Sequence, residues 1–275
     1  MVKKKVGLAL GIGSARGLAH IGVLRVLRHH GIPVDMIAGT SMGAVVGSLY
    51  ALRGNISRIE EIASSMTRMH VLSLVDLALP RTGLIAGQKI TAWGKSLIGR
   101  DIQFSDLQTP FACVATDIMS GKEIVISEGS VLEAVRASIS IPGIFSPAKR
   151  NGQYLVDGGL VNPVPVSTVK DMGADFIIAV NVMPDVGSGK TRWMGEKSRT
   201  GFKPPNIVEV LMQSLYIGSY KLARTASEGA DIVIEPQVGH IGPGEFHRAQ
   251  ECILQGELAA EDCMPKLKRL LTPRT

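Results

Sequence analysis

One serine of this sequence lies in a pattern that can do nucleophilic chemistry. The residues Gly39-Thr40-Ser41-Met42-Gly43 follow a short apolar run and lead into a stretch of small residues. When Gly-x-Ser-x-Gly forms a sharp turn between a strand and a helix, the serine Oγ projects clear of the backbone, and the helix N-terminus stabilises negative charge beside it. The same residues could instead form a plain turn with Ser41 as a helix N-cap, so the pattern favours a nucleophile only together with its surroundings.

A glycine-rich loop over residues 11–17 precedes this serine and could supply an oxyanion hole. Glycine allows a ligand to approach the main chain closely, so the N–H groups of Gly13 and Ser14 could bind a carbonyl oxygen, with Arg16 adding positive potential. The loop also has glycines spaced like a dinucleotide fingerprint, followed by an acid, Asp35. Because Asp35 begins the next predicted strand instead of ending it, an NADP-binding oxidoreductase of the Rossmann type is the weaker alternative.

An aspartate is the candidate base. Asp157 ends the apolar run Tyr154-Leu155-Val156 and is followed by Gly158 and Gly159. Open α/β sheets place their sites at such strand ends, although Asp-Gly is also a common turn pair. A serine nucleophile needs a base, and this need favours Asp157. Two histidines that come later in the chain, His240 and His247, could complete a Ser-Asp-His triad as in α/β-hydrolase esterases, so that alternative stays open.

Four blocks of sequence resemble, in this order, the patatin-like phospholipase family. They are residues 11–24, 38–44, 138–145 and 156–159, which read GIGSARGLAHIGVL, AGTSMGA, SISIPGIF and VDGG. The chain is most similar to bacterial members related to the esterase domain of neuropathy target esterase, and the matched region extends from residue 6 to about residue 180. Many members have a run of glycines in the first block, where this chain has Ile12 and Ser14, a change that keeps the main-chain donors.

This resemblance implies a fold and a mechanism. The fold would be a three-layer α/β/α sandwich with a mainly parallel sheet. The site would be a dyad of Ser41 as nucleophile and Asp157 as general base, without histidine, with an oxyanion hole at Gly13, Ser14 and Arg16. The activity would be that of a serine esterase or lipid acyl hydrolase of the phospholipase A or lysophospholipase type, working through an acyl-enzyme. The substrates would be phospholipids, lysophospholipids or other fatty-acyl esters.

Composition bounds the other possibilities. The chain has 275 residues, 45% of them apolar and 20% charged, which is ordinary for a folded α/β protein. Its net charge of +6 suits an anionic lipid surface as well as nucleic acid, but scattered basic residues and only 4% aromatic residues give nucleic-acid binding little support. We expect no metal or other cofactor, since the sequence has no His-Glu-x-x-His motif and no cysteine-histidine cluster. A catalytically weak lipid-binding regulator on the same fold is a further alternative.

Cysteine usage and hydropathy indicate a compartment. Cys113, Cys252 and Cys263 form no Cys-x-x-Cys pair and leave an odd thiol, which favours a reducing environment. No apolar run reaches the roughly 18 residues of a membrane span. We therefore expect a cytoplasmic protein with at most peripheral contact at the inner face of the membrane. The sequence leaves the oligomeric state open.

Residues 1–275 are predicted to form one domain. Apolar runs at residues 6–10, 34–38, 111–116, 123–126, 154–156, 176–182 and 231–234 predict strands, and periodic patterns at 18–30, 52–70, 88–98, 131–139, 206–227 and 245–271 predict helices. Residues 206–275 would be a helical extension packed on the domain. The segment 72–84 and the flexible, basic segment 187–205 are candidate lids over the serine.

Overall fold

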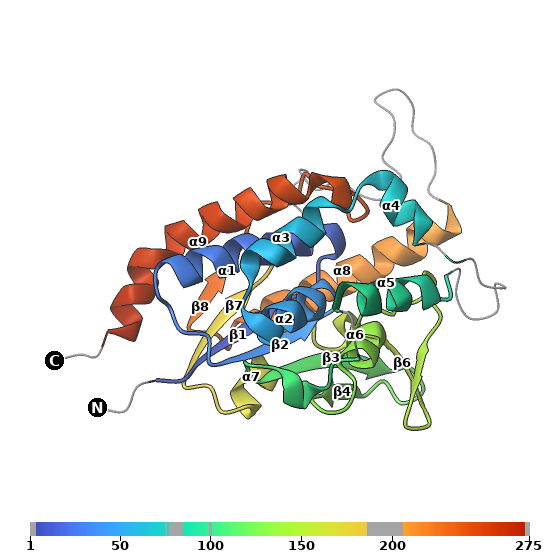
Figure 1. The fold of residues 1–275 in the computed structure, drawn as a ribbon, viewed down its shortest axis with the longest axis horizontal. Coiled ribbons are helices and arrows are strands. Elements are labelled where there is room, and N and C mark those ends of the chain that lie inside the picture. Colours follow the sequence, from blue (N-terminus) through green and yellow to red (C-terminus); the bar gives the residue numbers. More distant parts are fainter. Residues whose placement is uncertain (1–3, 75, 77–84, 99–100, 186–205, 273–275) are drawn as a thin grey trace.

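The computed structural model describes residues 4–74, 76, 85–98, 101–185 and 206–272 (Figure 1). Most of the segment 72–84 and all of the segment 187–205, the two candidate lids, lie outside these described residues. The prediction that either segment covers the site therefore stays a prediction.

An eight-stranded sheet forms the centre of the molecule (Figure 1). The hydrogen-bonded path runs β5-β6-β3-β2-β1-β7-β8, and β4 also pairs with β3. All pairs among β8, β7, β1, β2 and β3 are parallel, whereas the pairs made by β4, β5 and β6 are antiparallel. The strands are β1 (Val6–Leu10), β2 (Met36–Thr40), β3 (Phe111–Asp117), β4 (Glu123–Ile126), β5 (Ala148–Arg150), β6 (Gln153–Asp157), β7 (Phe176–Val180) and β8 (Ile232–Ile234).

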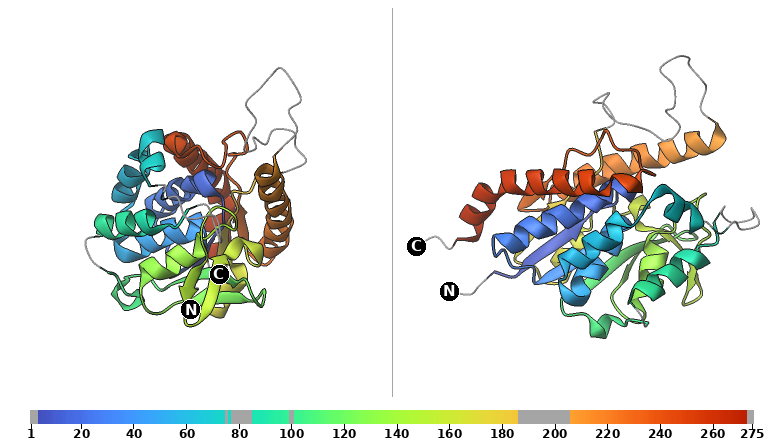
Figure 2. Two further views of the ribbon diagram at one scale, coloured as in Figure 1. Left: turned by 90° about the vertical axis from the view of Figure 1, so that its right-hand side faces the viewer. Right: turned by 45° about the horizontal axis from the view of Figure 1, so that its top comes forward.

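Helices cover both faces of the sheet, as the left view of Figure 2 shows. One core lies between the sheet and α1, α2, α3, α6 and α9, and a second lies between the sheet and α7 and α8. The expected three-layer α/β/α fold is confirmed. The helices are α1 (Ala19–His29), α2 (Met42–Arg53), α3 (Ile56–Ser64), α4 (Arg68–Ser73), α5 (Gln88–Ile98), α6 (Val131–Ser138), α7 (Val166–Asp171), α8 (Ile207–Ser227) and α9 (Ala249–Leu271).

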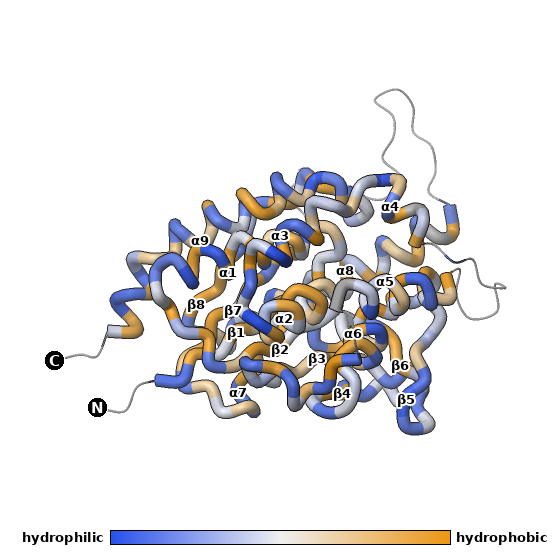
Figure 3. Tube along the Cα trace, viewed as in Figure 1, coloured by the Kyte–Doolittle hydropathy of each residue, from blue (hydrophilic) through white to orange (hydrophobic). Residues whose placement is uncertain are grey.

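Hydropathy explains why the central strands are buried. The strands β1, β2 and β7 are apolar or small throughout and every residue in them is buried, as parallel strands covered on both faces require. Along the helices, hydrophobic and hydrophilic residues alternate instead (Figure 3). This pattern is that of helices with one face on the sheet and the other in water.

The prediction of a single helix over residues 52–70 is wrong. The structure has the end of α2, then α3, then α4 in this stretch. Gly54 ends α2 in a left-handed conformation (φ 60°), and its N–H donates to the Tyr50 carbonyl oxygen at 2.7 Å. Asn55 then caps α3, because its side-chain oxygen accepts the Arg58 N–H at 3.1 Å. Gly54 is thus the signal that ends one helix, and Asn55 is the signal that begins the next.

The last helix packs backbone to backbone on the first. A Cβ added to Gly22 of α1 would lie 2.0 Å from the Ile253 carbonyl oxygen of α9, and one added to Gly256 would lie 2.0 Å from the Ala19 carbonyl oxygen. Arg25 of α1 also pairs with Glu257 of α9 and with Glu60 of α3. Among the described residues, no helix has both the length and the hydropathy needed to cross a membrane.

Gly22→Ala should lower the free energy of unfolding by about 3 kcal/mol, because the new methyl group would force α9 away from α1. Chemical denaturation followed by circular dichroism measures this change. Gly218→Ala is the matched control, since Gly218 lies in α8 with open space where its Cβ would be, and alanine there should be neutral or stabilise by about 1 kcal/mol. Equal losses in both variants would contradict the close contact of α1 and α9.

Candidate active site

Two strands that end toward each other along β3 bring Ser41 and Asp157 together. On one edge of β3, parallel β2 pairs with residues 111–114 and antiparallel β6 with residues 115–117, while β4 occupies the other edge. The last residue of β2, Thr40, lies opposite Val114, and the last residue of β6, Asp157, lies opposite the next position, Ala115. Ser41 directly follows Thr40. The sheet register therefore places the serine and the aspartate at one junction.

Ser41 occupies a strained elbow between β2 and α2. Its φ of 53° and ψ of −119° belong to a region that residues with side chains rarely adopt. A Cβ on Gly39 would lie 2.5 Å from the Gly43 carbonyl oxygen, and a Cβ on Gly43 would lie 2.1 Å from the Leu10 carbonyl oxygen. Only glycine fits at these two positions. They let α2 begin directly against the ends of β1 and β2, with its free N–H groups beside Ser41.

A buried serine of α6 holds this elbow in place. The Ser138 Oγ accepts the Ser41 N–H at 2.9 Å and donates to the Val114 carbonyl oxygen at 2.6 Å. Ser138 is fully buried, so the Ser41 N–H has no water to replace this acceptor. No role was predicted for Ser138 from the sequence. Its signal was a polar residue in the apolar stripe of a helix, seven positions after Val131 and four after Ala134.

The Asp157 carboxyl group is buried and hydrogen-bonded on two sides. It accepts a hydrogen bond from the Ser41 hydroxyl, and its Oδ1 accepts a second one from the Gly159 N–H at 2.8 Å. Burial raises the pKa of Asp157 to about 6, and the hydrogen bonds from Ser41 and Gly159 only partly offset that rise. The group is therefore ionised at neutral pH, yet it is a stronger base than an ordinary carboxylate.

The backbone of Asp157 is fixed through a second serine and an arginine. The Asp157 N–H donates to the Ser140 carbonyl oxygen at 2.9 Å. Arg136 reaches this loop from α6: it donates to the Ser140 Oγ, and also to the carbonyl oxygens of Ala86 at 2.9 Å and Ser146 at 3.0 Å. One guanidinium group thus ties the segment after α6 to the segment before α5. No role was predicted for Arg136 from the sequence.

The loop before α1 presents unpaired main-chain donors beside the serine. Within the described residues, the N–H groups of Gly13 and Ser14 donate to no protein acceptor. Both residues line a small cavity of about 70 Å³ together with Ser41 and Asp157. Ser14 has φ 51°, another strained conformation, and its Oγ donates to the Pro243 carbonyl oxygen at 2.7 Å. Gly158 and Gly159 continue from the aspartate, and Gly159 lines the same small cavity.

Arg16 is directed away from the serine. Its side chain is fully buried, its Nε donates to the Ile241 carbonyl oxygen at 2.6 Å, and its Nη1 donates to the Tyr216 hydroxyl at 3.0 Å. These contacts join the short 3₁₀ helix Ser14–Leu18 to α8 and to the segment before α9. Burial raises the pKa of Tyr216, while the charge of Arg16 acts to lower it. Tyr216 lines the small cavity together with Ser41. Arg16 therefore contacts a wall residue of this cavity, through its hydrogen bond to the Tyr216 hydroxyl.

The histidines make other contacts. His240 pairs with Glu251 at 2.7 Å, and His247 pairs with Arg68 at 3.1 Å. His20 is buried behind the first loop, where its Nε2 lies 2.8 Å from the Gly11 carbonyl oxygen, and burial lowers the pKa of its imidazole to about 4. Within the described residues, which include every histidine, none forms a hydrogen bond to the Ser41 or Asp157 side chain. The same residues contain no group of three or more His, Cys, Asp or Glu that could hold a metal ion.

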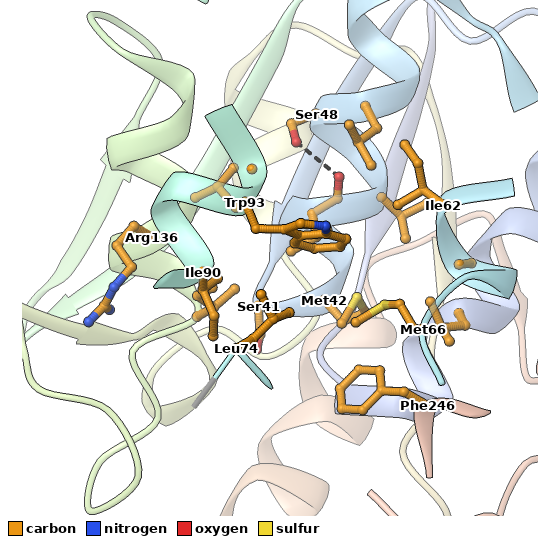
Figure 4. Close-up of a pocket in the computed structure, with 18 of the residues that line it drawn as sticks. Ser41, Met42, Ser48, Ile62, Met66, Leu74, Ile90, Trp93, Arg136 and Phe246 are labelled. Carbon is orange, nitrogen blue, oxygen red and sulfur yellow. Dashed lines mark hydrogen bonds between the residues drawn. The ribbon is translucent and has the colours of Figure 1, made fainter. Parts of the chain in front are cut away.

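Ser41 opens into an apolar cavity of about 210 Å³ (Figure 4). Its walls come from α1, α2, α3, α5 and α6. Figure 4 shows Trp93 above Ser41, with Met42, Met66 and Phe246 to one side and Ile90 to the other. A hydrocarbon chain attached to the Ser41 Oγ would leave water and contact mostly apolar side chains along this path.

Comparisons with known proteins point to one family. Residues 8–170 match the sequence model of a family described as patatin-like phospholipase. An uncharacterised NTE family protein of Mycobacterium bovis is 39% identical over 178 residues, which are 65% of this chain and 49% of that protein. Lysophospholipase NTE1 of Pyricularia oryzae is 31% identical over 284 residues, which cover 96% of this chain and 19% of that protein. The chain thus spans about half of the first relative and about a fifth of the second.

A solved structure supports the fold independently. The crystal structure of VipD from Legionella pneumophila superimposes with a TM-score of 0.56 and 12% identity, covering 96% of this chain and 67% of that chain. At this identity the likeness concerns the fold alone. The sequence match to the Pyricularia oryzae relative covers 96% of this chain, so it continues past the region of residues 6 to about 180 that carries the resemblance seen in the sequence.

Ser138→Ala should slow covalent labelling of Ser41 by a fluorophosphonate by about tenfold, because the buried Ser41 N–H loses its acceptor and the elbow relaxes. Ser138→Thr, which keeps the hydroxyl, should recover most of the labelling rate. Ser48→Ala is the matched control, since the Ser48 hydroxyl lines the same cavity but donates within α2, to the Val45 carbonyl oxygen. Labelling that is equally fast in Ser138→Ala and wild type would contradict this role.

Asp157→Asn should stabilise the protein at neutral and higher pH. The pKa of Asp157 is about 6 in the folded protein and 3.8 ordinarily, so the wild type loses stability as the pH rises from about 4 to about 6. Above that window, asparagine should raise the free energy of unfolding by up to about 3 kcal/mol. Below about pH 4, where both side chains are neutral, the gain should vanish. Urea denaturation across this pH range measures the difference.

Asp117→Asn provides a control of opposite sign. The Ser120 hydroxyl and then the Met119 N–H lower the pKa of Asp117, so its ionised form stabilises the fold above its ordinary pKa. This variant should lose stability at neutral pH, and its difference from wild type should shrink in acid. A gain of stability in Asp117→Asn, or a loss in Asp157→Asn at pH 8, would contradict the assigned environments.

Proposed function

The chain belongs to the patatin-like phospholipase family, and we propose that it is a serine esterase that hydrolyses fatty-acyl esters of lipids. The nucleophile is Ser41 and the general base is Asp157. The observation that supports this most is the hydrogen bond from the Ser41 hydroxyl to the buried Asp157 carboxylate, next to free main-chain N–H groups. The reaction then needs no relay through histidine.

The proposed mechanism has two halves. In the first, the Ser41 Oγ attacks the ester carbonyl carbon while its proton passes to Asp157, and this proton then leaves with the alcohol as the ester bond breaks. In the second, water gives a proton to Asp157 and attacks the acyl carbonyl carbon. The bond to the Ser41 Oγ then breaks, Asp157 returns the proton to this oxygen, and the fatty acid is released. A base with a pKa of about 6 suits proton transfer near neutral pH better than an ordinary carboxylate.

The oxyanion hole consists of main-chain donors in this proposal. The N–H groups of Gly13 and Ser14 would stabilise the negative oxygen of the tetrahedral intermediate, aided by the N-terminus of α2. Arg16 would act through the loop instead of touching the oxygen, because its guanidinium group holds the loop against Ile241 and Tyr216. The loop would thereby be fixed before substrate binds, which is what makes such donors effective.

The substrate class follows from the cavity and the relatives. The apolar cavity at Ser41 suits a fatty-acyl chain, and the fungal relatives are named lysophospholipases. We therefore propose phospholipase A or lysophospholipase activity, exerted at a membrane surface that the protein contacts peripherally. Exposed apolar side chains at the start of α8, Ile207 and Leu211, are 71% and 57% exposed and offer a contact for lipid.

We also propose that residues 1–275 act as one domain, since α8 lines the site and α9 packs on α1.

Ser41→Ala should abolish release of fatty acid from phosphatidylcholine vesicles, and Asp157→Asn should reduce kcat by roughly 1,000-fold while the protein stays folded. Because the base must be ionised, wild-type kcat/KM should fall tenfold per pH unit below about pH 6. Free fatty acid assays across pH, with circular dichroism for folding, make the measurement.

His240→Ala and His247→Ala serve as controls, because both side chains bond to groups outside the dyad. They should keep wild-type activity. An active Asp157→Asn enzyme combined with loss of activity in either histidine variant would establish a Ser-Asp-His triad instead. A protein that binds the vesicles in every form but releases no fatty acid would indicate a lipid-binding regulator.

A further inference from the structure

A second apolar cavity, of about 280 Å³, lies beside the first. Ser41 is not part of its wall. It is enclosed by Val71 of α4, by Ile144 in the loop before β5, and by Met212 and Tyr216 of α8. The two cavities meet at shared residues, among them Ser14, Met66 and Phe246. Two chambers of similar apolar character therefore adjoin at the first loop.

The second cavity also adjoins the dyad, through a wall that includes residues of α8. The small cavity that holds Ser41 and Asp157 shares four wall residues with it, Ser14, Ile141, Met212 and Tyr216. The first cavity instead begins at Ser41 and continues along α2, past Met42 and Val45. A molecule bound at Ser41 thus has one apolar space along α2 and another beyond Tyr216.

An ester needs two such spaces. Its carbonyl carbon carries the acyl chain on one side and the alcohol oxygen on the other, so the two parts diverge from the atom that Ser41 attacks. The acyl chain stays bonded to Ser41 after the first half-reaction, and the first cavity is the one that starts at Ser41. The alcohol part is then directed past Tyr216 and Met212 toward the second cavity.

The chemistry of this second cavity indicates what the alcohol carries. Its polar wall residues besides Ser14 and Tyr216 are Glu209 and Gln213, both from the first two turns of α8, and the rest of the wall is apolar. A glycerol head group alone would leave this apolar wall in contact with water. A second hydrocarbon chain would cover it.

We propose that the second cavity binds the second acyl chain of a diacylglycerophospholipid, so that the enzyme prefers two-chain lipids to lysophospholipids. This inference rests on the proposed esterase function and specifies its substrate. Water adds across the ester bond next to Ser41: the first cavity releases a fatty acid and the second releases a lysophospholipid. A lysophospholipid substrate fills only the first cavity and forfeits the burial of one chain.

The test compares two lipids in the same detergent micelles, dioleoylphosphatidylcholine and oleoyl-lysophosphatidylcholine. Wild-type kcat/KM should be at least about tenfold higher for the two-chain lipid. Val71→Trp fills the second cavity from α4, away from Ser41, and should remove that preference by slowing the two-chain lipid about tenfold while changing the one-chain lipid less than about twofold. Leu49→Trp, the matched variant in the first cavity, should slow both lipids.

Each outcome decides one question. Equal slowing of both lipids by Val71→Trp would mean that one long acyl chain passes through both cavities, and it would overturn the proposal. No effect on either lipid, or a wild-type enzyme that prefers the one-chain lipid, would overturn it as well. Ile144→Trp repeats the test from another wall if Val71→Trp does not fold, as judged by circular dichroism and fluorophosphonate labelling. Absence of fatty acid from both lipids and from p-nitrophenyl butyrate would instead refute the esterase function itself.

Discussion

The junction of β2 and β6 on one edge of β3 is the constraint on which this site depends. Because the two strands run toward each other and end at neighbouring positions of β3, the residues at their ends meet without any long loop. Ser41 enters from the parallel half of the sheet and Asp157 from the antiparallel half. A shift of one residue in either register would turn one of the two side chains to the opposite face of the sheet. The eight-stranded sheet therefore fixes the geometry of the pair more firmly than any contact between the two side chains.

Holding these groups in place works against stability in two ways. Ser41 and Ser14 both have positive φ, which costs each of them roughly 1 kcal/mol or more, and the ionised Asp157 is buried. Buried hydrogen bonds offset that cost: Ser138 holds the Ser41 N–H, and Arg136 holds the segment that carries Ser140. Such strain and burial are common where proteins place reactive groups, which supports the proposed roles of Ser41 and Asp157.

The two faces of the sheet contribute different parts of the surroundings. The face covered by α1, α2, α3 and α6 provides the apolar space that begins at Ser41. The other face contributes α8, whose Met212 and Tyr216 line both the second cavity and the small cavity that holds Ser41 and Asp157. Arg16 couples the two, because it extends from the first loop to Tyr216. This enclosure from both faces provides the two adjoining apolar spaces that the proposed binding of two hydrocarbon chains requires.

The family, the three-layer fold, most strands and helices, the elbow at Ser41 and the Asp-Gly-Gly turn at Asp157 could all be predicted from the residues alone. These features are local: glycine spacing, apolar runs and periodicity act between near neighbours, so they can be read along the chain. The break between α2 and α3 at Gly54 and Asn55 was not predicted, although the glycine that ends one helix and the asparagine that caps the next were both present in the sequence. Other features became visible only in the folded structure. Ser138 accepts the Ser41 N–H, and Arg16 donates to the Tyr216 hydroxyl. His240 pairs with Glu251, away from the dyad, and two cavities meet at the first loop. Those contacts join residues far apart in sequence, and the register and packing of the whole sheet decide them, which no local pattern encodes.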